Sequence, residues 1–282
     1  MKLCRYGKTG YEKPGLIDAD GRIRDLSKIV DSIGPNEISA RGIRVLSKLK
    51  PESLPLVNGN PRFGVPYIGI GKFVAIGLNY SDHAREAGLP IPSEPIVFMK
   101  ATTCISGPSD DVIQPKNSTK LDWEVELGVV IGTQARYVDE ASALNHVAGY
   151  CIVNDVSERV FQMATSQWDK GKSFDTAGPI GPWLVTTDEV PDPQALDMLL
   201  EANGRKMQSG STRTMVFSVA KIIAHVSQYM TLLPGDIIAT GTPPGVGLGI
   251  KPTPIFLKPG DVMRLTIHGL GEQKQRVVAY SA

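Results

Sequence analysis

Residues 121–132, which read LDWEVELGVVIG, alternate between polar and apolar side chains with the period of a β-strand. Three carboxylates, those of Asp122, Glu124 and Glu126, fall on one face of this predicted strand, and apolar side chains fall on the other. Residues two apart on a strand lie about 6.7 Å from each other, so their side chains converge on one point only around a shared ligand. A divalent cation is the natural ligand for such carboxylates.

A sheet with one solvated acidic face is the alternative interpretation of this pattern. The acidic face continues as Gly128, Val130 and Gly132, which is not typical of a solvated face. Under cover, the two ionised glutamates would cost several kcal/mol, or their pKa values would rise, unless a cation compensated them. The pattern alone leaves both interpretations open.

A second group with chemical potential follows the apolar run 73–78, which predicts a buried strand. Ser81 is placed to cap a short helix that continues through Glu86. On one turn of such a helix, Glu86 can orient the imidazole of His83 and raise its basicity, as a general base requires. An exposed helix with an incidental His–Glu pair fits the same spacing. Glycines and prolines flank the segment, which would suit a mobile lid.

A third group lies after residues 147–153, another apolar run that predicts a buried strand. Asp155 follows the end of this strand, where it either contributes to a site or simply caps a helix. If a helix begins near Asp155, Arg159 and Gln162 lie on the same side and offer a guanidinium and an amide to an anionic ligand. Lys172 lies in the loop DKGKSFDTAGPIGP, where most lysines are solvated.

The segment ATGTPPGVGLGI is a weak candidate for a phosphate-binding loop, because two prolines interrupt it and no predicted helix follows. Gly241 and Thr242 are better interpreted as a strand end that offers a hydroxyl and backbone groups to a ligand.

Composition excludes several classes of function. The formal net charge is +1 and no run of Lys and Arg occurs, which argues against nucleic acid or an anionic membrane surface as a partner. The first residues lack the apolar core of a signal peptide, and no apolar run is long enough to span a bilayer. Three scattered cysteines are typical of reduced, buried thiols. We therefore expect a cytoplasmic protein.

The fold class follows from turns and periodicity. With 29 Gly and 21 Pro and no low-complexity tract, the chain is rich in tight turns, which favours an α+β fold that is mainly β. Residues 1–65 are predicted to form a small N-terminal domain, with a hairpin at Asp20-Gly21 and a helix over 38–49. Residues 66–282 form the larger domain, with a hairpin at Asn203-Gly204 and an amphipathic helix over 218–230.

Five segments, in chain order, resemble the fumarylacetoacetate hydrolase superfamily: GLNYSDHAREAG, DWEVELGVVIG, GYCIVNDVSERVFQ, GKSFDTAGPIGP and PGDIIATGTPPGVG. The resemblance covers roughly residues 67–282, and residues 1–65 resemble the small domain that many bacterial members carry. It implies the family's β-roll, a homodimer and a Mg²⁺ (or Mn²⁺) site.

The resemblance also implies roles for individual residues. The metal ligands are Glu124, Glu126 and Asp155. The water-activating pair is His83 and Glu86, and the active-site lysine is Lys172. Contacts to the substrate's carboxylate and keto-enol oxygens come from Arg159, Gln162 and Thr242. Fumarylacetoacetate hydrolase itself has a further metal-binding Asp seven residues ahead of its His, where this chain has Ile76. Three protein ligands are the pattern of the smaller, acylpyruvate-cleaving branch.

The chemistry of these residues agrees with such a reaction. Three carboxylates are hard oxygen donors that suit Mg²⁺ or Mn²⁺ and not zinc. A Lewis-acid metal that chelates a 2-oxo acid can hold the charge of a leaving pyruvate enolate, with Lys172 beside it, while His83 and Glu86 deprotonate the attacking water. We therefore expect hydrolysis of a 2,4-dioxo acid to pyruvate and a second carboxylate.

Within the superfamily, the chain most resembles bacterial hydrolases of 2,4-diketo-3-deoxy sugar acids (2,4-diketo-3-deoxy-L-fuconate or rhamnonate), a group often labelled ureidoglycolate lyase. Fumarylpyruvate hydrolysis, oxaloacetate decarboxylation and isomerisation of a keto-enol acid are alternatives on the same metal site. A non-catalytic oxo-acid binding protein is a further alternative, although it would have no obvious use for the His83–Glu86 pair. The accepted acyl group depends on loops that the sequence does not place.

Overall fold

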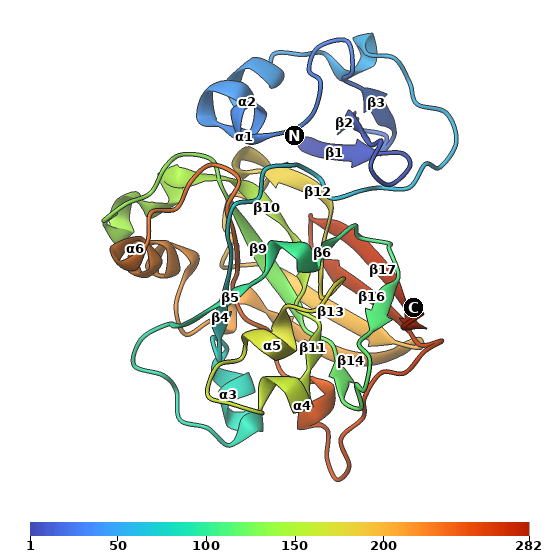
Figure 1. The fold of residues 1–282 in the computed structure, drawn as a ribbon. Coiled ribbons are helices and arrows are strands. Elements are labelled where there is room, and N and C mark those ends of the chain that lie inside the picture. Colours follow the sequence, from blue (N-terminus) through green and yellow to red (C-terminus); the bar gives the residue numbers. More distant parts are fainter. Residues whose placement is uncertain (282) are drawn as a thin grey trace.

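The computed structural model describes residues 1–281, and strands dominate it, as the composition predicted (Figure 1). The expected α+β, mainly β fold class is confirmed. The larger sheet has the order β3-β2-β1-β12-β10-β9-β15-β4-β5, with β6 attached to β12. Its strands are β1 (Lys2–Tyr6), β2 (Lys13–Ile17), β3 (Ile23–Asp25), β4 (Phe73–Gly77), β5 (Ile96–Lys100), β6 (Ile105–Ser106), β9 (Val125–Ile131), β10 (Val147–Asn154), β12 (Gly178–Thr186) and β15 (Ile237–Ala239).

A second sheet has the order β14-β13-β16-β17-β7 and packs against β9, β10 and β12 of the first. Its strands are β7 (Val112–Gln114), β13 (Asp197–Ala202), β14 (Arg205–Ser211), β16 (Val262–Ile267) and β17 (Gly271–Ala279). The predicted hairpin at Asn203-Gly204 joins β13 to β14. The second sheet covers one face of the first, and every residue of β9 is buried.

The helices are short, and no helix in residues 1–281 has the length and apolar composition that a membrane span requires. They are α1 (Pro35–Ile38), α2 (Ala40–Leu46), α3 (Ser81–Ala87), α4 (Arg159–Gln162), α5 (Asp169–Lys172) and α6 (Val219–Tyr229). The amphipathic helix predicted over 218–230 is α6, which Ser218 caps. The single helix predicted over 38–49 is wrong: α1 and α2 are separated at Ser39, whose hydroxyl instead caps α2 by accepting from Gly42 N.

The N-terminal strands form one end of the molecule (Figure 1). The predicted hairpin at Asp20-Gly21 is confirmed as β2–β3. β1 pairs with β12, with Leu3 opposite Leu184, so these strands extend the larger sheet. Arg62 adds an ion pair to Asp110 at 2.5 Å, between the first 65 residues and the remainder. A domain boundary near residue 65 stays a prediction.

The acidic segment 121–132 forms two strands instead of one. β8 (Leu121–Asp122) pairs with β11 (Ser157–Glu158), whereas β9 pairs with β10 and β15. Between β8 and β9 the backbone leaves regular strand pairing, and its N–H groups bind side chains instead. Trp123 N donates to the Asp122 carboxylate, and Val125 N donates to the side chain of Gln208. The break falls at Trp123 and Glu124, beside the candidate site.

Candidate active site

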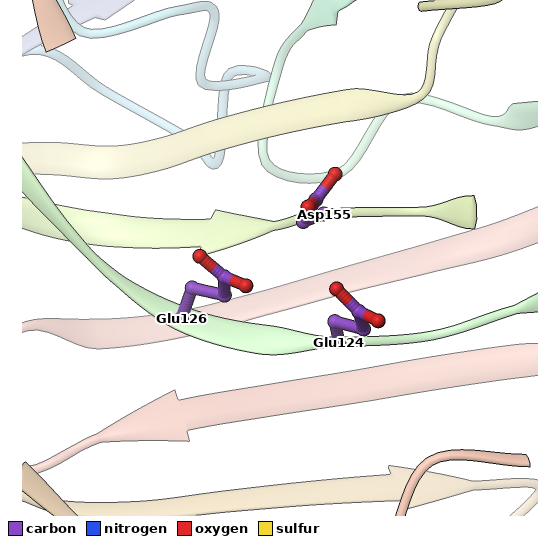
Figure 2. Close-up of side chains that lie close together, drawn as sticks. All are labelled: Glu124, Glu126 and Asp155. Atoms are coloured by element: carbon purple, nitrogen blue, oxygen red, sulfur yellow. The ribbon is translucent and has the colours of Figure 1, made fainter. Parts of the chain in front are cut away.

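The register of β9 on β10 brings the metal-ligand candidates together. Val153 lies opposite Glu126, and two residues further along the chain Asp155 lies beside Glu124, where Asp155 N donates to Glu124 O at 2.9 Å. Glu124 and Glu126 project from their segment on the same side as Asp155 from the end of β10 (Figure 2). One oxygen from each of the three carboxylates lies within 4.8 Å of the other two. Of the three carboxylates predicted to share a face, Glu124 and Glu126 therefore converge with Asp155, whereas Asp122 lies outside this group and binds Arg159.

Burial decides between the two interpretations of this face. Glu124 is 6% exposed, Glu126 2% and Asp155 0%, so the alternative of a solvated acidic face is wrong. Three hard oxygen donors at these separations fit a divalent cation, since opposite ligands of Mg²⁺ at about 2.1 Å lie about 4.2 Å apart and small side-chain shifts suffice. The Glu124, Glu126 and Asp155 side chains would hold that cation.

Buried cations already surround two of the three carboxylates. Lys172 Nζ lies 2.7 Å from both Glu124 Oε2 and Asp155 Oδ2, and Arg159 Nη2 lies 2.8 Å from Glu124 Oε1. Lys100, which is also buried, pairs with Asp155 Oδ1 at 2.6 Å and donates to the Lys172 carbonyl. Within the described residues, Glu126 has no ion-pair partner, and its Oε2 accepts only from Gly241 N at 2.8 Å.

This unequal distribution of charge shifts the pKa values of Glu124 and Glu126 in opposite directions. Burial raises the pKa of Glu124, but Lys172 and Arg159 outweigh that effect and lower it to about 2. Burial, followed by the charges of Asp155 and Glu124, raises the pKa of Glu126 well above its usual range. Burial opposes the charge on Lys172, yet Asp155 and Glu124 raise its pKa. Positive charge is therefore missing at Glu126, where a divalent cation would supply it.

The predicted His–Glu pair forms on α3 and lines the same cavity. His83 Nδ1 lies 3.0 Å from Glu86 Oε2, and both side chains are partly buried. Glu86 is fixed from the other side because its Oε1 accepts from Gly245 N at 2.9 Å. An incidental pair on an exposed helix does not describe this arrangement. The predicted cap was wrong, since α3 begins at Ser81 after Tyr80 and no side chain caps it.

Gly249 sets the space available to Glu86. A Cβ at Gly249 would lie 2.7 Å from Glu86 Cδ, so Gly249→Ala should push the carboxylate away from His83. Misplacement by about 1 Å typically costs up to 10²-fold in rate, and we expect turnover to fall roughly tenfold to a hundredfold. Steady-state kinetics would measure the loss. A Gly34→Ala variant is the control, because Gly34 has a φ of −131°, an added Cβ would meet its nearest atoms only at 3.4 Å or more, and the residue lies outside the cavity. Unchanged turnover in Gly249→Ala would contradict the importance of Glu86 placement.

Arg159 and Gln162 lie together, but not as the sequence suggested. The helix predicted to start near Asp155 is wrong: α4 begins at Arg159, because residues 157 and 158 pair with β8 and Glu158 caps the helix through Phe161 N at 2.7 Å. Arg159 Nη1 donates to Gln162 Oε1 at 2.9 Å, and Arg159 Nε donates to Asp122 Oδ2 at 2.8 Å.

Lys172 does not lie in a solvated loop, as its sequence context suggested. It is the last residue of α5 and is 2% exposed. α5 packs directly on α4, because Gly171 has no side chain where a Cβ would lie 2.4 Å from Gln162 N. Close packing of these two short helices thereby carries Lys172 to the carboxylates.

Thr242 follows β15 at the edge of the cavity. Its hydroxyl donates to Val125 O at 2.9 Å and accepts from Gln208 Nε2 at 2.8 Å. The side chain thus joins the loop after β15 to the start of β9, next to the acidic cluster.

The cavity that these residues share has a volume of about 430 Å³, a size typical of small-molecule sites. Each of the nine residues selected from the sequence lines it or its mouth: His83, Glu86, Glu124, Glu126, Asp155, Arg159, Gln162, Lys172 and Thr242.

Comparison with known proteins agrees with this geometry. Residues 72–278 match the family described as fumarylacetoacetate (FAA) hydrolase C-terminal. The chain belongs to the fumarylacetoacetate hydrolase family. A Burkholderia multivorans protein, whose name places it among the hydrolases without a substrate, is 62% identical to this family member over 98% of each chain. Family membership and such names indicate that the chain is an enzyme.

Solved structures of the fumarylacetoacetate hydrolase fold superpose along the whole chain. A fumarylacetoacetate hydrolase from Exiguobacterium antarcticum has a TM-score of 0.89 and 36% identity, over 99% of this chain and 100% of that one. A maleylpyruvate hydrolase from Sphingobium sp. SYK-6, solved with manganese(II) and pyruvate, has a TM-score of 0.82 and 28% identity, over 100% of each chain. The fold expected from the sequence is therefore the fold of this family.

Sequence analysis missed several residues of this fumarylacetoacetate hydrolase site. The alternation places Asp122 on the acidic face but does not indicate its role, which is to bind Arg159 Nε and to accept from Gly247 N and Leu248 N. Lys100 was missed altogether. Its signal is a lysine that ends the apolar run PIVFMK, where a buried strand carries a charge that needs a partner.

Proposed function

We propose that this protein is a Mg²⁺- or Mn²⁺-dependent hydrolase that cleaves a carbon–carbon bond of a 2,4-dioxo acid and releases pyruvate and a second carboxylate. The observation that supports this proposal is the combination of three buried, convergent carboxylates with a fixed His–Glu pair in one cavity. The carboxylates of Glu124, Glu126 and Asp155 would hold the cation, which supplies Lewis-acidic charge for the oxygens of a 2-oxo acid.

The other side chains of the cavity would activate the water, bind the substrate and stabilise the leaving group. Glu86 orients His83 through Nδ1, which leaves Nε2 to accept a proton from water. Arg159, held by Asp122 and Gln162, presents a fixed guanidinium to the substrate's carboxylate. Lys172 places a positive charge where negative charge develops on the leaving group. The hydroxyl of Thr242 holds the strand end in place.

The reaction class can be tested with a panel of oxo acids. With Mg²⁺, the protein should release pyruvate from acetylpyruvate, fumarylpyruvate or a 2,4-diketo-3-deoxy sugar acid, together with one equivalent of the second acid. Coupled reduction by lactate dehydrogenase measures pyruvate, and chromatography measures the acid. Pyruvate from oxaloacetate alone, with carbon dioxide, would favour a decarboxylase instead. Loss of the enol absorbance without either product would indicate an isomerase.

The expected homodimer is also a proposal. Light scattering of the purified protein would test it, with twice the mass of the 30.4 kDa chain as the expected result.

A further inference from the structure

The two peptide groups between Glu124 and Glu126 lie where β9 loses one of its neighbouring strands. β15 pairs with residues 128–130 of β9 and ends there. On the other flank, β10 still lies opposite Val125, and Glu124 O accepts from Asp155 N at 2.9 Å. Because buried backbone groups need hydrogen-bond partners, the N–H and C=O groups of Val125 must find theirs in side chains on the β15 flank.

The side chain of Gln208, from β14 of the second sheet, takes the place of the missing strand. Its Oε1 accepts from Val125 N at 2.9 Å, and its Nε2 donates to Pro243 O at 2.7 Å and to Thr242 Oγ1 at 2.8 Å. These partners fix the orientation of the amide, since a backbone N–H requires Oε1 and a backbone carbonyl requires Nε2. Gln208 is fully buried, so water does not compete for these bonds.

The orientation of the Gln208 amide also decides where the hydroxyl proton of Thr242 goes. A hydroxyl has a single proton to donate. Thr242 Oγ1 accepts from Gln208 Nε2 and lies 2.9 Å from Val125 O, which can only accept, so the proton is directed to Val125 O. While this bond persists, the hydroxyl has no proton to donate to a substrate carboxylate. Gln208 and Thr242 together therefore hold both peptide groups between the two glutamates.

We propose that Gln208 is a positioning residue for metal binding, which acts on the N–H of Val125 directly and on its carbonyl through Thr242. The two peptide groups set the directions in which the side chains of Glu124 and Glu126 leave the backbone, so the amide fixes how their carboxylates converge. The inference rests on the proposed function, which assigns these carboxylates to a cation, and adds the residues that hold them in place. Groups that orient metal ligands without touching the ion typically change metal affinity about 10–100-fold.

The first test measures Mn²⁺ binding by isothermal titration, well below the melting temperature of each variant. Gln208→Met removes the amide but keeps a side chain of similar length, and the dissociation constant for Mn²⁺ should rise about 10–100-fold. Gln194→Met is the matched control. The amide of Gln194 also joins two segments, at Val219 N and Thr212 O, and lies outside the cavity. Its loss should lower the melting temperature but leave the Mn²⁺ dissociation constant within about twofold of wild type, because no metal ligand depends on it.

The second test uses variants of Thr242 to separate positioning from contact with substrate. Thr242→Val keeps the shape of the side chain but removes the donor to Val125 O, so Mn²⁺ affinity should fall about tenfold. Thr242→Ser keeps the hydroxyl and should restore most of that affinity. A hydroxyl that only contacts substrate would instead raise KM and leave Mn²⁺ binding unchanged. Thr240→Val is the control, since Leu127 O keeps its bond from the residue 240 N–H when that hydroxyl is lost.

The outcomes distinguish this inference from the proposed function. If wild type binds Mn²⁺ and Glu126→Gln does not, but Gln208→Met and Thr242→Val bind it as wild type does, the inference is wrong and the metal site stands. Equal weakening in Gln194→Met would also overturn it, because the effect would then be general destabilisation. If wild type does not bind Mn²⁺, or Glu126→Gln binds it unchanged, the proposed metal site fails and the inference fails with it. If Gln208→Met does not fold, the comparison of Thr242→Val with Thr242→Ser decides.

Discussion

Glu126→Gln is expected to abolish the rise in melting temperature that Mg²⁺ or Mn²⁺ gives to the wild-type protein. A ligand at 100 times its dissociation constant contributes about 2.7 kcal/mol, which corresponds to a shift of about 5–10 °C for a protein of this size. Glu126 is the carboxylate without a cationic partner in the described residues, so its loss should remove the cation most directly. Differential scanning fluorimetry over a metal titration would measure the shift, and pyruvate release should be lost in parallel.

The fold should survive this substitution. Burial and the two neighbouring acids raise the pKa of Glu126, so a neutral amide replaces a group that is costly to ionise without metal. The new side-chain oxygen can still accept from Gly241 N. Glu52→Gln, at an exposed position outside the cavity, is the matched control and should keep the full metal response. A metal-dependent shift of normal size in Glu126→Gln would show that the three carboxylates do not form the site.

His83→Ala and Glu86→Gln should separate water activation from ligand binding. Neither side chain contacts the acidic cluster through a hydrogen bond or ion pair in the described residues. Both variants should therefore keep the metal-dependent shift and the binding of oxalate, a pyruvate analogue. Turnover should fall by about 10²–10⁴-fold, the usual contribution of a general base. Isothermal titration gives the binding, and steady-state kinetics give the rate.

The double variant distinguishes a pair that acts as one base from two independent contributors. If Glu86 acts by orienting His83, the double variant should be no slower than His83→Ala, because the base is already absent. Additive losses would mean that the two residues act separately. Full activity in both single variants, or a matching loss of metal affinity, would remove the pair from the mechanism and leave Lys172 as the candidate for water activation.

Local patterns in the sequence predicted the parts of this site that lie within one strand or one helical turn. Alternation placed Glu124 and Glu126 on one side, and the spacing of three placed His83 beside Glu86. These relations depend only on backbone geometry over a few residues, so the sequence contains them directly. Residue-type chemistry together with family resemblance then selected Asp155, Arg159 and Lys172 from distant segments.

What the sequence did not predict depends on contacts between distant segments. The break before β9 arises because Gln208, more than 80 positions away, binds Val125 N at 2.9 Å. The shortness of α4 follows from pairing between β8 and β11, which no helical periodicity reveals. Lys100 has its carboxylate partner 55 residues along the chain. Tertiary partners, and not local propensity, decide such features.

The loop after β15 has a property that matters for how substrate range can change. Its backbone N–H groups, at Gly245, Gly247 and Leu248, bind the carboxylates of Glu86 and Asp122. The side chains of Val246 and Leu248, in the same loop, face the cavity. Because main chain holds the acids and side chains shape the wall, substitutions at Val246 and Leu248 can alter which acyl groups fit while the anchoring contacts persist. The loop is thus a natural place for directed evolution to vary selectivity without dismantling the catalytic groups.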